Sequence, residues 1–155
     1  MDNSAEHLRT LMQENKKIIA PLLKYLPYLG NAAEKSAVTT YKGDGIEASS
    51  VPFPVYDSTL LAFIKEADRS VLMDRNYPYT YTRNNLKTHD QERRFILAAD
   101  WRQWDALRGI LSKYVLGGRT RSVLWSEGVS EQIFYLVLSR MQEITEFWTS
   151  KDNNQ

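Results

Sequence analysis

Apolar residues recur at spacings of three and four along much of this 155-residue chain, a pattern typical of helices that bury one face. The first apolar stripe runs from Leu8 to Leu26 and predicts an opening helix. Pro21 lacks a backbone donor, so it either kinks this helix or restarts it. Asp57 is a good N-cap for a second helix. Stripes of this kind most often face the core.

Start signals mark two further helices in the second half of the chain. Thr88 with Gln91 matches a capping box, in which two side chains satisfy backbone donors at a helix start. Asp100 with Gln103 makes a second box, within the cleanest apolar stripe of the chain, Trp101 to Val115. We expect the two tryptophans at the start of this stripe to be core residues.

A last long helix is predicted from about Ser126 to Trp148, and its apolar centre places it in the middle of a bundle. Strand-like residues at Val38–Lys42, a turn at Gly43-Asp44-Gly45 and a return at Ile46–Val51 predict a small hairpin. The alternation in Tyr77-Pro78-Tyr79-Thr80-Tyr81 fits a short strand or extended segment with one aromatic face.

These elements predict a mainly α protein, a single-domain helical bundle of about five helices with a minor β-hairpin or extended segment. No linker or repeat divides the chain, so residues 1–150 form one helical domain, and the polar tail 151–155 is expected to be disordered. The longest apolar run, Ile133–Leu138, is far shorter than the roughly 20 residues of a membrane span. The polar start, Met1–Glu6, is unlike a secretion signal, so we expect a cytoplasmic protein without membrane association.

The residue types that carry most enzyme chemistry are scarce. The chain has no cysteine and only two histidines, which excludes disulfides, thiolate zinc sites and cysteine nucleophiles. His89, Asp90 and Glu92 stand together at a predicted helix start, where carboxylates favour the helix dipole; residues so close in sequence cannot all face one ion. The chain contains neither a phosphate-binding loop nor a serine-hydrolase elbow. We therefore expect no metal, no cofactor and no catalytic residue.

The formal net charge is only +1, but the charges are unevenly distributed. Residues 83–121 hold nine Lys or Arg against four acidic residues, a net charge of +5, whereas residues 122–155 have a net charge of −3. Two explanations compete. Either the acidic last helix packs beside the basic segment and the charges pair, or the basic segment faces an anionic partner.

The hexapeptide Gly117–Ser122 contains the elements of an anion site, because two glycines allow a backbone concavity and two arginines flank it. The alternative, which we favour, is a turn between helices in which Gly117-Gly118 provides a left-handed cap. Nearby aromatic side chains could offer stacking surfaces to bases or a peptide. The candidate residues for binding a partner or an anion are Tyr77, Tyr79, Tyr81, Arg83, Arg119, Arg121 and Trp125.

Six short motifs follow one another along the chain after residue 22. They are Leu26-Pro27-Tyr28-Leu29, Val55-Tyr56 leading to Phe63-Ile64, the stretch Asp74 to Tyr81, Leu111-Ser112-Lys113-Tyr114-Val115 with Gly118-Arg119, Trp125-Ser126-Glu127-Gly128-Val129, and Leu138-Ser139-Arg140-Met141. Their order resembles a family of small uncharacterised bacterial proteins, catalogued as a domain of unknown function. The resemblance implies a bacterial, cytoplasmic protein and brings with it no activity, cofactor or catalytic residue.

We therefore expect a non-catalytic interaction protein whose partner is another protein or a second copy of itself. The expected contact surface is the stretch Tyr77 to Arg83 together with the turn around Arg119. A nucleic-acid-binding protein that uses residues 83–121 is the first alternative. An enzyme that acts on a small anionic substrate at the turn 117–122 is the second.

Overall fold

The computed structural model describes residues 3–32, 38–40 and 54–150. These residues form eight α-helices, one short 3-10 helix (η1) and two short strands. The elements are α1 (Asn3–Leu23), α2 (Leu26–Ala32), β1 (Val38–Thr40), β2 (Pro54–Tyr56), α3 (Ser58–Arg69), α4 (Tyr77–Arg83), α5 (His89–Ala98), η1 (Trp101–Gln103), α6 (Trp104–Gly117), α7 (Val123–Ser130) and α8 (Ile133–Thr149). The prediction of a mainly helical fold is confirmed.

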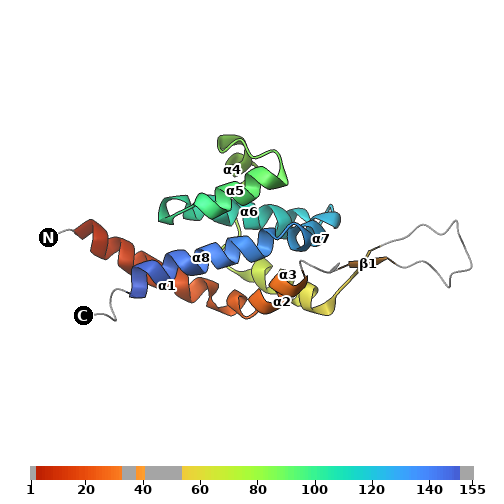
Figure 1. Cartoon of the computed structure of the whole chain (residues 1–155), viewed down its shortest axis with the longest axis horizontal. Helices are drawn as coiled ribbons and strands as arrows, with labels where there is room; N and C mark the ends of the chain where they lie inside the picture. The colour runs from red at the N-terminus through yellow and green to blue at the C-terminus, as the bar shows by residue number, and fades with distance from the viewer. Residues whose placement is uncertain (1–2, 33–37, 41–53, 151–155) are drawn as a thin grey trace, which may run out of the picture.

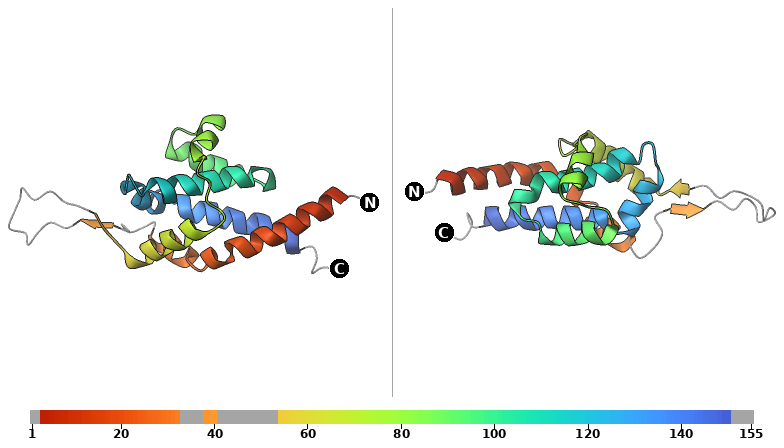
Figure 2. Two further views of the ribbon diagram at one scale, coloured as in Figure 1. Left: turned by 180° about the vertical axis from the view of Figure 1, so that it is seen from behind. Right: turned by 90° about the horizontal axis from the view of Figure 1, so that it is seen from above.

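The two longest helices, α1 and α8, pack against each other in opposite directions, so the start of α1 and the end of α8 lie at the same end of the molecule (Figure 1). Helix α6 packs on α8, while α4 covers α6 and α5 contacts α8. Figure 2 shows this layering from behind and from above. The strands β1 and β2 pair antiparallel. They project from the end of the helical body that is opposite to the start of α1 and the end of α8. In the described part of the chain, no helix combines the length and the apolar character needed to cross a membrane.

The core lies where α3, α6 and α8 meet. The ring of Phe134 in α8 contacts Phe63 of α3 at a centroid distance of 5.0 Å and Tyr114 of α6 at 6.1 Å, both edge to face. All three side chains are completely buried. Edge-to-face packing of this kind stabilises a core beyond the area that it removes from water.

The predicted helix-start signals are confirmed. The Asp57 carboxylate accepts from the backbone N–H of Thr59 at 2.7 Å, and both capping boxes, at Thr88 and at Asp100, have their side-chain and backbone bonds in place. The second box begins the 3-10 turn η1, which leads directly into α6. Helix α1 continues through Pro21 and ends two residues later.

The predicted count of about five helices is too low, partly because the expected helix from Ser126 to Trp148 is two helices. Gln132 separates α7 from α8 with a left-handed backbone, φ 65°. Gly128 of α7 explains this turn, because a Cβ at that position would lie only 2.4 Å from the ring of Phe134. Helices α7 and α8 thus fold back into close contact with each other. The sequence does not reveal the turn between them, because the apolar pattern continues through both helices.

Two expectations for extended segments need correction. Tyr77–Tyr81 is part of helix α4 rather than a strand, because Pro78 in the first turn has the backbone angle that a helix start requires. The partner of β1 is Pro54–Tyr56, whereas the predicted return strand, 46–51, lies outside the described residues, as does the tail 151–155. In the described chain the hairpin is a ladder of three residue pairs.

Candidate interaction groove

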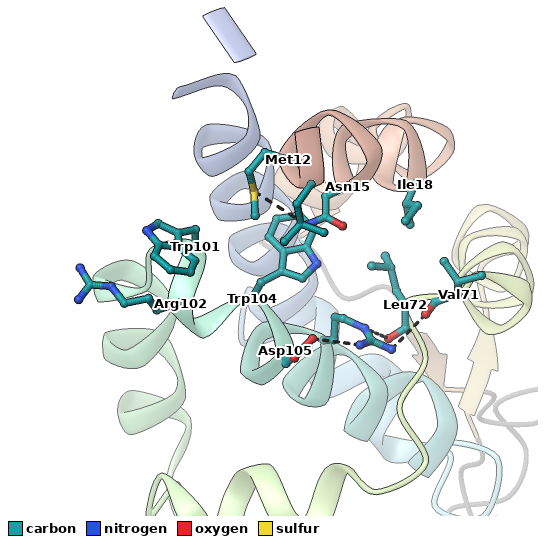
Figure 3. A pocket seen from close by; sticks show the side chains of 11 residues that line it. Met12, Asn15, Ile18, Val71, Leu72, Trp101, Arg102, Trp104 and Asp105 are labelled. Atoms are coloured by element: carbon teal, nitrogen blue, oxygen red, sulfur yellow. Dashed lines mark hydrogen bonds and ion pairs between the residues drawn. The ribbon is translucent and has the colours of Figure 1, made fainter. Parts of the chain in front are cut away.

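A pocket of about 460 Å³ opens between α1, the turn that follows α3 and the start of α6 (Figure 3). Met12, Asn15 and Ile18 of α1 lie along one side, and Val71 and Leu72 close one end (Figure 3). Leu11, Trp101, Arg102, Trp104, Asp105 and Arg108 complete the lining. We call this pocket and its rim the groove. Its size and its mostly apolar walls are those of a typical ligand or peptide site.

The rim of the groove exposes large apolar side chains. Val71 is 69% exposed, Leu11 44% and Trp101 37%. The expectation that both tryptophans of the α6 stripe are core residues is therefore wrong for Trp101, although Trp104 is buried at 7% exposure. The 3-10 turn η1 carries Trp101 outside the first turn of α6, so its side chain is left at the surface.

Inside the groove, two buried side chains have unused hydrogen-bonding groups. The indole N–H of Trp104 has no hydrogen-bond partner among residues 3–32, 38–40 and 54–150. Asn15, 7% exposed, donates only to the sulfur of Met12 at 3.9 Å, and no described residue donates to its amide oxygen. Although the two residues are mostly buried, both polar atoms remain open to the pocket, where a bound group can reach them.

Arg108 fixes the wall of the groove opposite α1. Its guanidinium donates to the carbonyl oxygens of Leu72 and Val71, each at 3.1 Å, and forms an ion pair with Asp105 at 3.1 Å. These bonds tie the turn after α3 to α6. Contacts within the protein therefore hold this wall in place, and the guanidinium of Arg108 is already bonded to Leu72, Val71 and Asp105.

Arg102 lies at the meeting point of three hollows. It lines the groove, a neighbouring hollow of about 430 Å³ against the end of α8, and a third of about 520 Å³ between α4 and α6. Its side chain is 67% exposed, lies over the Trp101 ring at 5.8 Å from the centroid, and pairs with Asp100 at 3.1 Å. The second hollow adds exposed Phe147 and its neighbour Trp148 to the apolar surface.

The three predicted tyrosines all lie on helix α4, and their side chains point in different directions. Tyr79 is exposed and lines the third hollow with Arg83, which donates to the Tyr79 hydroxyl at 3.4 Å. The Tyr81 hydroxyl instead points inward and donates to Glu92. The Tyr77 hydroxyl lies against Gly117, at the far end of α6. Tyr79 and Arg83 therefore line one of the three hollows, whereas Tyr77 and Tyr81 line none of them.

The backbone N–H groups of the turn after α6 are hydrogen-bonded within the protein. The N–H groups of residues 118–121 donate to carbonyl oxygens of residues 114–117, so none of these four points towards an anion. Gly118 has φ −67°, not the left-handed backbone we expected; glycine is needed because a Cβ would lie 2.1 Å from the Trp125 ring. The Trp125 indole donates to the Val115 carbonyl at 3.0 Å.

The two arginines of this turn differ. Arg119 forms an ion pair with Asp68 of α3, which joins the turn to the body of the protein. Arg121 is exposed and has no ion pair with any residue that the structure describes. Neither residue faces the groove or the two neighbouring hollows.

A buried polar cluster was not anticipated from the sequence. The Glu92 side chain, 2% exposed, accepts from Tyr114 at 2.7 Å and from Tyr81, with His89 Nδ1 at 3.0 Å and Lys113 Nζ at 3.6 Å. Burial, and then the neighbouring Glu92 carboxylate, raise the pKa values of both tyrosine hydroxyls. None of these residues lines the groove or its two neighbouring hollows. The cluster joins α4, α5 and α6 and acts as a structural clamp.

Many charges of the basic segment 83–121 are paired. Arg93 pairs with Asp90 and, at 2.8 Å, with Glu131 near the start of α8, so basic and acidic segments do meet. The other paired basic residues of this segment are Arg102, Arg108, Lys113 and Arg119. Arg83, Lys87, Arg94 and Arg121 are exposed without an ion pair in the described ranges.

Comparisons with known proteins add no relative, since no family model, curated protein or solved structure matches this chain. The resemblance to a family of uncharacterised bacterial proteins stays a prediction. Among the described residues, no group of three or more His, Asp or Glu side chains could hold a metal ion.

Proposed function

We propose that this chain is a non-catalytic protein-interaction domain and that the groove, with the apolar rim around Trp101, is its binding surface. The observation that carries the proposal is the concentration of exposed Leu11, Val71 and Trp101 around a concave pocket. Apolar surface gathered at a hollow is typical of a docking site, whereas single exposed apolar residues are ordinary. In line with the resemblance, we place the protein in a bacterial cytoplasm.

This proposal moves the binding surface away from the one expected from the sequence. The expected surface joined Tyr77–Arg83 to the turn around Arg119, but Tyr81, Arg119 and Trp125 are engaged within the fold. Tyr79 and Arg83 remain candidates, because their hollow shares Arg102 with the groove.

The experiment is a selection of random dodecapeptides displayed on phage against the immobilised full-length protein. We expect peptides that bind the native chain and lose binding to Val71→Asp and to Trp101→Asp. The matched control is Leu97→Asp, because Leu97 is 60% exposed on α5 and lines none of the three hollows. A selection in which every bound peptide is insensitive to both rim variants would reject the groove as the binding surface.

A second candidate function is nucleic-acid binding through residues 83–121, supported by exposed cations, such as Arg83 and Arg94, that have no ion pair within the described part of the chain. Fluorescence anisotropy with labelled duplex DNA and single-stranded RNA at two salt concentrations tests it. Binding that weakens steeply with salt, and is lost on Arg83→Glu with Arg94→Glu, would support phosphate contacts. An absence of binding at low salt would remove this candidate.

A further inference from the structure

We propose that the occupant of the groove is an extended segment of a partner protein, with an apolar anchor residue next to an acidic residue. Its backbone carbonyl accepts from the Trp104 indole N–H, and its backbone N–H donates to the Asn15 amide oxygen. This inference rests on the proposed function and specifies the class of partner.

The unused polar groups are the first support. Trp104 offers a donor and Asn15 an acceptor, each on a side chain more than nine-tenths buried in the lining of one pocket. Every peptide unit carries one carbonyl acceptor and one N–H donor, so an extended segment can satisfy both. An occupant that was apolar throughout would leave both groups buried without partners, which opposes binding.

The apolar walls are the second support. Met12 and Ile18 of α1 line the groove together with Leu72, and Figure 3 shows the Trp104 ring next to Asn15. A cavity of about 460 Å³ accommodates one large apolar side chain together with the backbone on either side of it. This geometry favours a peptide anchored by one inserted side chain.

Charge complementarity is the third support. The charged residues that line the groove are Arg102, Arg108 and Asp105, which give it a net charge of +1. Arg108 bonds backbone carbonyls and Asp105, whereas Arg102 pairs with Asp100 at 3.1 Å but keeps a side chain that is 67% exposed at the junction of the three hollows. A carboxylate beside the apolar anchor complements this arginine.

The experiment uses synthetic peptides from the selection described above, with affinity for the full-length chain measured by calorimetry. We expect Asn15→Leu and Trp104→Phe each to weaken binding about fivefold to tenfold, since each removes one hydrogen bond. Arg102→Glu should weaken binding of peptides with an acidic residue more than binding of their amide counterparts.

Trp125→Phe is the matched control. It also removes an indole N–H, but one that donates to the Val115 carbonyl within the fold. We expect it to lower stability and to leave peptide affinity unchanged. Circular dichroism establishes that each variant is folded, and Asn15→Leu carries the test if Trp104→Phe does not fold.

The outcomes are distinguishable. If peptides require Trp101 but bind Asn15→Leu and Trp104→Phe as they bind the native chain, this inference fails and the proposed function stands. If no selected peptide requires the rim, the proposed function fails as well. If sedimentation shows a dimer of the native chain that Trp101→Asp dissociates, the occupant is a second copy and the inference of a partner peptide is overturned.

Discussion

The hydroxyl of Tyr114 lies 2.7 Å from Oε1 and 2.9 Å from Oε2 of Glu92, which joins a tyrosine of α6 to a carboxylate of α5 inside the protein. Tyr81 donates to the same carboxylate from α4. A buried carboxylate costs free energy unless donors surround it, so the three helices depend on one another for the stability of this cluster.

Tyr114→Phe removes one donor to Glu92 without changing the shape of the ring. We expect the free energy of unfolding to fall by about 2 kcal/mol, the usual effect of a hydrogen bond to a charged group. Urea denaturation measures it. Tyr135→Phe is the control, because no described residue bonds the Tyr135 hydroxyl, and it should change stability by less than about 0.5 kcal/mol. Equal stability of Tyr114→Phe and the native chain would contradict the clamp.

The same cluster predicts a loss of stability at alkaline pH. Burial and Glu92 raise the pKa values of Tyr81 and Tyr114 above the value of about 10 that they have when unfolded. Their contribution is therefore complete below about pH 10 and is lost as pH rises further. Unfolding measured between about pH 8 and 11.5 should show stability falling above pH 10, with a shallower fall in Tyr114→Phe. A curve that stays flat to the highest pH would refute this prediction.

Asn15→Leu should stabilise the protein. Asn15 is 7% exposed and, among the described residues, its amide bonds only the sulfur of Met12, so a leucine of similar size removes an under-satisfied polar group from the groove. We expect the free energy of unfolding to rise by about 1 kcal/mol. A residue kept for binding at the expense of stability behaves in this way. Thermal and urea unfolding test it, and a marked destabilisation would assign Asn15 a structural role.

Gly118→Ala should destabilise the junction of α6 and α7. A Cβ there would lie 2.1 Å from the Trp125 ring, so the indole must move and its bond to Val115 is disturbed. We expect a loss of about 1–3 kcal/mol. Gly30→Ala serves as the comparison, because its Cβ would meet Tyr135 at an ordinary 3.5 Å and alanine favours helix α2. Similar stabilities of the two variants would show that the close approach is unimportant.

Features set by neighbours in sequence were predictable. The bonds of the capping boxes at Thr88 and Asp100 join residues two to four positions apart, so their residue types alone identify them. The break between α7 and α8 was not predictable, because it depends on Gly128 meeting Phe134 while the apolar pattern continues past it.

The groove and the clamp depend on contacts between distant segments. Leu11 and Trp101 lie on the same apolar stripes as buried Met12 and Trp104, and the positions left uncovered are decided by helices far away in sequence. Glu92 has the position of an ordinary dipole-stabilising residue at a helix start, and only the approach of Tyr81 and Tyr114 buries it. A count of charges could not show that Arg93 is paired while Arg94 is exposed, because one partner of Arg93, Glu131, lies far away in sequence.

The most direct test of the groove as a binding surface is calorimetric titration of a selected peptide into the native chain, Trp101→Asp and Leu97→Asp. We predict that Trp101→Asp weakens binding at least about tenfold, since it places a charge in the apolar rim, while Leu97→Asp binds as the native chain does. Equal affinity of all three proteins would contradict the assignment of the groove as the site of interaction.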